Sequence, residues 1–205
     1  MPGLKTIQPS WVALVEIIRQ LEEQPYHWPI GRTTFQKIAY VATRQGLPTG
    51  FEYQKGSFGP FSRDLKNAET KLVNNNLLQE ERCGQMFLVK SGPNFDRVRK
   101  DFQDSLDKWM PIIEKTTDLF MRVNTDQAEV IATVMFAADA LKMEKRSVPT
   151  ETEVLDAVLR WKQKRRPPLD EAAVASTIRN LGMLRWLDVK PDAGLPVPEE
   201  ESIPA

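Results

Sequence analysis

The sequence contains very little cysteine or histidine and has no excess of either charge. Its 205 residues include one cysteine and one histidine, and 28 basic residues balance 28 acidic residues. One cysteine cannot form an intramolecular disulfide framework, and a zinc site of thiolate and imidazole ligands lacks donors. The balanced charge disfavours binding of nucleic acid through the overall field of the protein, but it leaves local basic patches open.

Long apolar runs are also missing. No run approaches the roughly 20 residues that a helix needs to span a bilayer, and the N-terminal MPGLKTIQPS has no apolar signal core. We therefore expect a cytoplasmic protein with no membrane partner. Hydrophobic residues make up 41% of the chain, which is typical of a globular protein that buries a core.

Helical periodicity dominates the sequence and predicts a mainly α protein with short β hairpins, of the α+β class. Three helices are expected in the first half, with apolar faces on residues 11–21, 35–42 and 65–73. Ser62 is placed to cap the third of them. Two strands, 77–81 and 86–90, are expected to form a hairpin. Helices followed by a hairpin are the pattern of a winged helix, so we expect a winged-helix-like unit over residues 10–92.

The second half is predicted to be a helical unit over residues 93–189. A long helix is expected to begin near Pro93 and to be kinked or split at Pro111. Capping boxes are expected at Asn124 with Gln127 and at Thr150 with Glu153, and Asp170 is placed to cap the last helix.

The ends of the chain have their own predictions. The alternating apolar stretch 182–189 is expected to be a strand, which gives a second helix–strand element and a bundle with one or two winged-helix-like units. Residues 1–9 are expected to be a flexible N-terminus, and the Pro/Glu-rich segment 190–205 a disordered tail.

The sequence nominates no catalytic residue, metal ligand or cofactor, so we expect a binding protein and not an enzyme. His27 lies between two aromatic residues without a nucleophile or carboxylate partner, which favours a packed loop residue. The glycines between residues 46 and 59 match neither common phosphate-loop pattern. Gly56 and Gly59 are instead expected to allow positive φ in turns around Pro60.

Two charged clusters each have two interpretations. The basic cluster is Arg160, Lys162, Lys164, Arg165 and Arg166, which is suited to phosphate contact or to the C-terminus of a helix. The acidic arc is Asp104, Asp107, Glu114 and Asp118, which is suited to imitating a phosphate backbone or to an ordinary solvated face. The structural interpretation is favoured for both.

The most specific segment runs from Gly31 to Leu65. It contains GRTTFQKIAY at 31–40 and FGPFS at 58–62, with dense aromatic residues between them. Tyr53, Lys55 and Ser57 alternate with those aromatic residues in an extended piece, so the segment suits both core packing and an exposed recognition surface.

This segment, with Gly46 and Phe51, resembles the C-terminal region of the DarG antitoxins of DarTG toxin–antitoxin systems. The similarity extends over most of residues 10 to 190, and its specific motifs lie between 31 and 65. A shorter form of the same pattern occurs in SocA-like (Panacea) antitoxin domains. Phe58 stands where the DarG family usually has tyrosine.

The resemblance implies an antitoxin module. DarT is an ADP-ribosyltransferase that uses NAD to modify thymidine in single-stranded DNA, and the C-terminal region of DarG blocks its DNA site as a DNA mimic. The chain has no recognisable macrodomain of the kind that reverses the modification in DarG. We therefore expect an excised C-terminal portion or a naturally split protein, a monomer that forms a one-to-one complex with a DarT-type toxin.

Carried over onto the motifs, the resemblance implies a contact surface above a core of Phe35, Ile38 and Leu65. The implied contact residues are Arg32, Gln36, Lys37, Tyr40, Tyr53, Lys55, Phe58, Phe61, Ser62 and Arg63. Two rival hypotheses remain. One is a winged-helix DNA-binding transcriptional regulator, with DNA as its partner. The other is a proteolytic adaptor of the SocA type.

Overall fold

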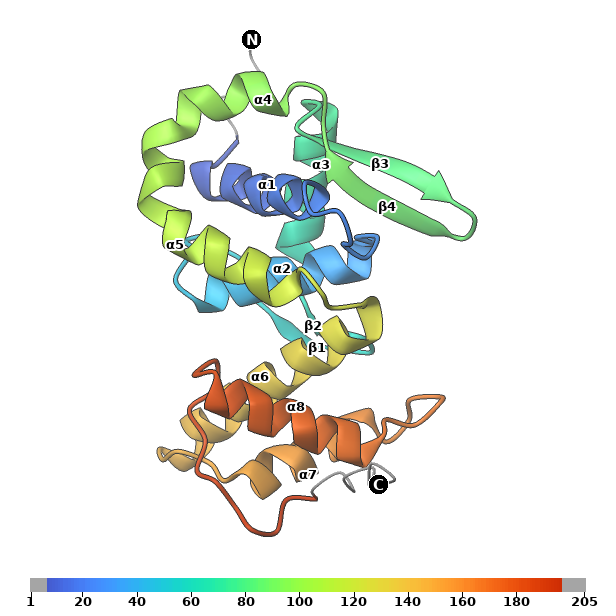
Figure 1. The fold of residues 1–205 in the computed structure, drawn as a ribbon, viewed down its shortest axis with the longest axis vertical. Helices are drawn as coiled ribbons and strands as arrows, with labels where there is room; N and C mark the ends of the chain where they lie inside the picture. Colours follow the sequence, from blue (N-terminus) through green and yellow to red (C-terminus); the bar gives the residue numbers. More distant parts are fainter. Residues whose placement is uncertain (1–6, 197–205) are drawn as a thin grey trace, which may run out of the picture. The chain divides into compact units, whose positions relative to one another are not determined.

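The computed structural model describes residues 7–196 and divides the chain into two compact units. The first unit ends at Glu129 and the second begins at Val130, whereas the expected boundary lay at residue 92. The boundary falls later because helix α5 (Gln103–Phe120) packs along α1 (Pro9–Glu22) and so belongs to the first unit (Figure 1).

The first unit is helical with two small antiparallel hairpins, as the sequence predicts. Its other helices are α2 (Arg32–Arg44), α3 (Arg63–Asn74) and the short α4 (Phe95–Val98). Strands β1 (Gln54–Gly56) and β2 (Gly59–Phe61) form one hairpin between α2 and α3. Strands β3 (Leu78–Cys83) and β4 (Met86–Ser91) form the other, which projects from the helices (Figure 1). The mainly helical α+β class is therefore confirmed.

The β3–β4 hairpin is anchored by the segment that precedes α2. Its register pairs Leu78 with Ser91 at the base and Cys83 with Met86 at the tip. Gly31 forms a further bridge with Leu88, and the Val89 amide donates to the Ile30 carbonyl at 2.7 Å. The entry to α2 is thereby fixed against β4.

Helix α1 supplies the centre of the first core. Several of its apolar side chains are fully buried, including Val12, Leu14 and Ile18. Of the expected kink or split at Pro111, the split is wrong: helix α5 runs past Pro111, which is exposed. The break falls earlier, at a 3₁₀ turn over Arg99–Phe102.

That 3₁₀ turn is tied to α1 by a buried carboxylate. The side chain of Glu16 is 1% exposed, and it accepts hydrogen bonds from Arg99 Nε and Nη2, both at 3.0 Å. Arg19 Nη2 donates to the same carboxylate, also at 3.0 Å. A buried carboxylate is tolerated only when such charge-assisted bonds replace its hydration.

Helix α6 (Thr125–Lys145) spans the boundary, and the second unit adds α7 (Glu151–Lys162) and α8 (Glu171–Met183). The predicted caps are confirmed. Thr150 and Glu153 form a reciprocal capping box, Asn124 and Gln127 exchange the same pair of bonds, and Asp170 caps α8. Ser62 likewise caps α3.

The expected strand at 182–189 is wrong. Helix α8 continues to Met183, and Arg185 adopts a φ of 57°, which turns the chain back. The amides of Trp186 and Leu187 then donate to the Leu181 carbonyl, and both side chains are buried. Their apolar side chains are therefore buried by a turn at the end of the helix and not by a sheet.

The expected disorder of the tail is also wrong for its described part. The Lys190 amide donates to the Pro149 carbonyl, and the Leu195 side chain is buried. Glu151, itself buried, accepts from Arg179 at 2.7 Å and from the Asp192 amide at 2.9 Å. At the other end Ile7 is buried and α1 begins at Pro9. The remaining residues of both predicted flexible ends, 1–6 and 197–205, lie outside the described residues.

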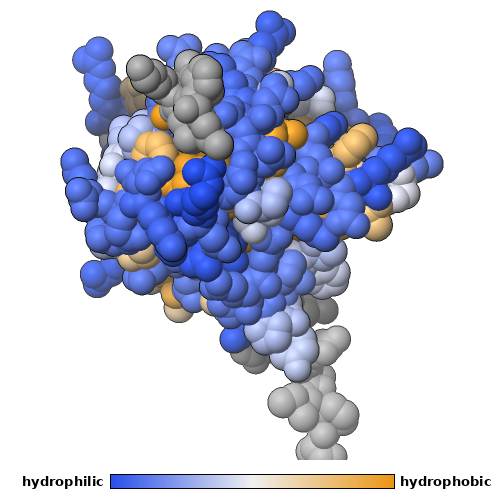
Figure 2. All heavy atoms as spheres, turned by 90° about the horizontal axis from the view of Figure 1, so that it is seen from above, coloured by the Kyte–Doolittle hydropathy of each residue, from blue (hydrophilic) through white to orange (hydrophobic). Residues whose placement is uncertain are grey.

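In the part of the chain that the structure describes, no helix is long and apolar enough to cross a bilayer. The face drawn in Figure 2 is mainly hydrophilic, with its apolar side chains in small separate patches.

Replacing Glu16 with glutamine should destabilise the first unit by about 3 kcal/mol, because two arginines lose their shared counter-ion in a poorly solvated site. Urea unfolding of the wild type and the Glu16→Gln variant measures this loss. Glu23→Gln is the matched control, since Glu23 pairs with Arg19 at an exposed position; its expected effect is below about 0.5 kcal/mol. Equal losses in both variants would contradict the assigned role of Glu16.

Candidate binding groove

Two polar side chains of α2 hold the FGPFS turn in place. Gln36 Nε2 donates to the Ser62 carbonyl and the Ser62 amide donates to Gln36 Oε1, both at 3.1 Å. Lys37 Nζ donates to the Pro60 carbonyl at 2.8 Å. Gln36 is 8% exposed and Lys37 only 2%. The two halves of the motif, GRTTFQKIAY and FGPFS, are therefore joined inside the protein.

The glycines of the hairpin have different roles. Gly59 has a φ of +89°, as expected for a turn that favours glycine. Gly56 does not have a positive φ, so that expectation is wrong. A Cβ at Gly56 would lie 3.0 Å from the Gly59 carbonyl oxygen and 3.2 Å from Phe61 Cβ. Gly56 is thus required by the close approach of the two strands.

The aromatic residues of the segment divide between core and surface. Tyr40 and Tyr53 meet edge to face with ring centroids 5.1 Å apart, and Phe51 stacks on Trp11 at 6.0 Å. Burial raises the pKa of the Tyr53 phenol. Phe58, in contrast, is 64% exposed at the hairpin turn, and Phe61 is half-buried.

The implied contact surface is therefore narrower than expected. Phe35, Ile38 and Leu65 are fully buried beneath it, as predicted. The structure also buries four implied contact residues, because their polar groups or rings are used inside the fold: Gln36, Lys37, Tyr40 and Ser62. Tyr53 is half-buried, with its ring against Tyr40 and its hydroxyl oxygen buried. The implied contact residues that remain accessible are Arg32, Lys55, Phe58, Phe61 and Arg63.

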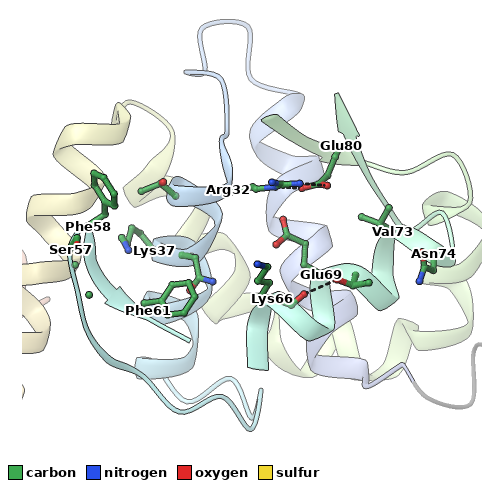
Figure 3. A pocket seen from close by; sticks show the side chains of 15 residues that line it. Arg32, Lys37, Ser57, Phe58, Phe61, Lys66, Glu69, Val73, Asn74 and Glu80 are labelled. Carbon is green, nitrogen blue, oxygen red and sulfur yellow. Dashed lines mark hydrogen bonds and ion pairs between the residues drawn. The ribbon is translucent and has the colours of Figure 1, made fainter. Parts of the chain in front are cut away.

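Several of the accessible residues border a groove of about 590 Å³. Its walls come from α2, the β1–β2 hairpin, α3 and β3 (Figure 3). Phe58, Phe61 and Val73 give it apolar surface. Its charged lining residues are Arg32, Lys37, Lys66, Glu69 and Glu80. An apolar groove with a few convergent polar groups is the usual form of a binding site.

An ion pair closes one side of the groove. Arg32 Nη2 donates to Glu80 Oε2 at 2.6 Å, and Arg32 Nε donates to the other carboxylate oxygen. The Arg32 guanidinium also lies 4.0 Å above the centre of the Phe87 ring. The hydrogen bonds from Arg32 lower the pKa of Glu80 and raise that of Arg32 itself. Both groups therefore remain charged at neutral pH.

Glu69 is the residue of the groove that the sequence reasoning missed. It is 8% exposed, and its Oε1 atom is buried without a hydrogen-bond partner. Burial, with a smaller contribution from the Glu80 charge, raises the pKa of Glu69 from 4.5 to about 7. The sequence did contain a signal, because Glu69 lies four residues after Leu65 and three before Leu72, on the apolar stripe of α3.

The other candidate residues lie outside the groove. Two arginines of the basic cluster donate hydrogen bonds to backbone carbonyls just after the end of α7. Arg165 Nη1 donates to the Pro167 carbonyl at 2.8 Å, and Arg166 Nη1 donates to the Arg165 carbonyl at 3.0 Å. Lys162 is buried beside Trp161. The acidic arc is exposed along α5, interleaved with exposed Lys108 and Lys115. These observations favour the structural interpretation of both clusters.

His27 is half-buried, with Nδ1 3.0 Å from the Trp28 carbonyl oxygen. Across residues 7–196 no group of three or more His, Cys, Asp and Glu side chains is placed to hold a metal ion. The groove therefore offers aromatic surface, one ion pair and one buried carboxyl group, which is chemistry for binding.

Comparison with known proteins adds no family assignment: no protein-family model matches the chain, and no curated protein matches it.

Glu69 should make stability depend on pH. Because its pKa is about 7 in the folded protein and lower in the unfolded chain, the folded state holds the proton more tightly. This contribution to stability is present below pH 4.5 and is lost as the pH rises through 7. As the pH rises between those limits, the stability of the Glu69→Gln variant relative to the wild type should therefore increase by up to about 3 kcal/mol.

Urea unfolding of both proteins across this pH range measures the difference. The matched control is Glu52→Gln, which makes the same substitution at an exposed position on the chain before β1. A constant difference between wild type and Glu69→Gln at every pH would show that Glu69 is not buried as described.

Proposed function

We propose that the chain is an antitoxin module that binds a DarT-type DNA ADP-ribosyltransferase and occupies its site for single-stranded DNA. The main support for this proposal is the way in which the motif segment is held together. Buried Gln36 and Lys37 hold the turn so that Phe58 projects at the edge of the groove. The proposed action is occupation of the site by a monomer in a one-to-one cytoplasmic complex, without catalysis.

Rigidity makes the turn suitable for tight binding. An exposed aromatic side chain on a fixed backbone loses less conformational freedom on association than one on a mobile loop. Aromatic residues and arginine also dominate the energetics of interfaces. Phe58 and Arg32 border the same groove, so they offer both kinds of anchor.

The chemistry of the turn also suits a site for single-stranded DNA. Such sites stack unpaired bases on aromatic side chains and hold phosphates with cations. Phe58 offers a flat apolar face that can replace a base, and the groove contains carboxyl groups that can replace phosphates. Because the positive and negative charges of the whole chain balance, imitation of DNA must depend on shape and on local groups.

Replacing Phe58 with alanine should weaken the complex by about tenfold or more, because a central aromatic contact is lost. The measurement is growth rescue on co-expression with an active DarT-type toxin, together with co-elution on size exclusion. Phe58→Tyr should bind at least as well as wild type, since tyrosine is the usual residue of the resembled family. Met86→Ala is the matched control, because Met86 is also exposed but lies at the tip of the other hairpin.

Two results would count against this proposal. Continued toxicity without co-elution of the wild-type chain would remove the antitoxin function. Full rescue and co-elution by Phe58→Ala would keep the function but remove the turn from the interface.

One observation favours a second candidate, a winged-helix DNA-binding regulator. Helix α3 precedes the β3–β4 hairpin and exposes Arg63, Lys66, Asn67 and Lys71, whereas its exposed acidic residue is Asp64 alone. A basic, amide-bearing helix is typical of a reading helix in the major groove. Titration of duplex DNA against salt concentration tests it: binding should fall steeply as salt rises. Absent binding at low ionic strength would exclude this candidate.

A further inference from the structure

The buried carboxyl group of Glu69 needs a partner that the fold itself does not supply. Figure 3 shows the side chain rising from α3 toward the ion pair of Arg32 and Glu80. Its Oε1 atom is buried and accepts no hydrogen bond within the fold, although the side chain lines the groove. Buried polar atoms in native proteins are almost always paired, so an unpaired carboxyl oxygen in a groove points to a ligand.

Two of the neighbouring cations, Arg32 and Lys37, are bonded to other groups. From α2, Arg32 is bonded in bidentate fashion to Glu80 of β3, and Lys37 donates to the Pro60 carbonyl. From α3 itself, Lys66 is exposed and lies one helical turn before Glu69. The charges of Arg32 and Lys66 lower the pKa of Glu69 without a hydrogen bond to it, and the charge of Glu80 raises that pKa. No internal side chain forms an ion pair with it among the described residues.

The walls of the groove define what kind of donor fits. Phe58, Phe61 and Val73 provide apolar surface that a methylene stem can cover, and aromatic faces that attract a cation. Arginine meets these requirements better than lysine. Its guanidinium is planar, weakly hydrated and able to bond a carboxylate in bidentate fashion while it stacks on a ring.

We propose that the groove receives an arginine side chain of the protein partner, with Glu69 as the counter-ion of its guanidinium. The inference deepens the proposed function and rests on it for the identity of the partner. A protein cleft that binds a nucleic-acid backbone presents arginine and lysine to phosphates. Glu69 then takes the place of a phosphate, held below the surface in a groove that Phe58 and Phe61 also line.

Binding of arginine at this position displaces a proton. Burial raises the pKa of Glu69 to about 7, so the carboxyl group is partly protonated at neutral pH. The guanidinium binds the ionised form, and the proton passes to the solvent. Affinity should therefore increase by about tenfold from near pH 6 to near pH 8, as the ionised fraction of Glu69 rises. The Arg32–Glu80 pair keeps its charges over this range.

The first experiment uses the full chain and a small probe, Nα-acetyl-arginine amide, with Nα-acetyl-norleucine amide as the uncharged control. Nuclear magnetic resonance of the isotope-labelled protein follows the Glu69 carboxyl carbon and the amides of Thr70 and Val73. We expect saturable shifts with the arginine probe alone, stronger near pH 8 than near pH 6. Glu69→Gln should abolish them, and Glu52→Gln should leave them unchanged. Saturation that is absent, or that survives in Glu69→Gln, would overturn the proposal.

The second experiment separates this inference from the proposed function. Affinity for a DarT-type toxin is measured for wild type and Glu69→Gln near pH 8, with an expected loss of about tenfold. Glu69→Gln should fold at least as stably as the wild type, so that unfolding does not explain a loss. Toxin binding that is equal in both proteins, without a response to the probe, would overturn the arginine site while the antitoxin function stands. A response to the probe without toxin binding would keep the arginine site and remove the toxin as its source.

Discussion

The hydrogen bonds that α2 sends into the FGPFS turn determine the geometry of the whole candidate site. Lys37 is an almost fully buried lysine, and burial of an ammonium is costly unless its hydration is replaced. The Pro60 carbonyl supplies that replacement, and proline leaves the turn without an amide donor at the same residue. Gln36 satisfies both backbone groups of Ser62, whose side chain then caps α3. Loss of any of these bonds would disturb α2, the hairpin and α3 together, and these elements are walls of the groove.

The features that the sequence predicted correctly depend on local interactions. Ser62, Asp170 and the pair of Thr150 with Glu153 cap helices within three residues of themselves, so their spacing alone was sufficient. Of two predictions that failed, the first did so because it depends on a contact between distant residues. The tail looks disordered by composition, but Glu151 bonds to Asp192 across the second unit. The apolar alternation after α8 suited a strand equally well until the turn at Arg185 was known.

The candidate site was predicted only in part, for a related reason. A polar residue inside a motif can face a partner or the backbone of its own chain, and both uses require the same donors and acceptors. Gln36 and Lys37 were expected at the contact surface, but they bond the turn. Glu69 shows the converse. It occupies a position on the apolar stripe of α3, where a core residue would be expected, yet its buried carboxyl group lines the groove.

Burial also bears on the proposed mimicry of DNA by a protein with balanced charge. The carboxylates of the acidic arc are exposed and interleaved with lysines, so water and salt screen their field. A carboxyl group in a low-dielectric groove acts more strongly on a cation that reaches it. At neutral pH it is also partly protonated before that cation arrives, so it adds less than a full charge to the free protein. One buried carboxyl group can therefore give local selectivity for a basic cleft without the net negative charge that general mimicry of DNA would require.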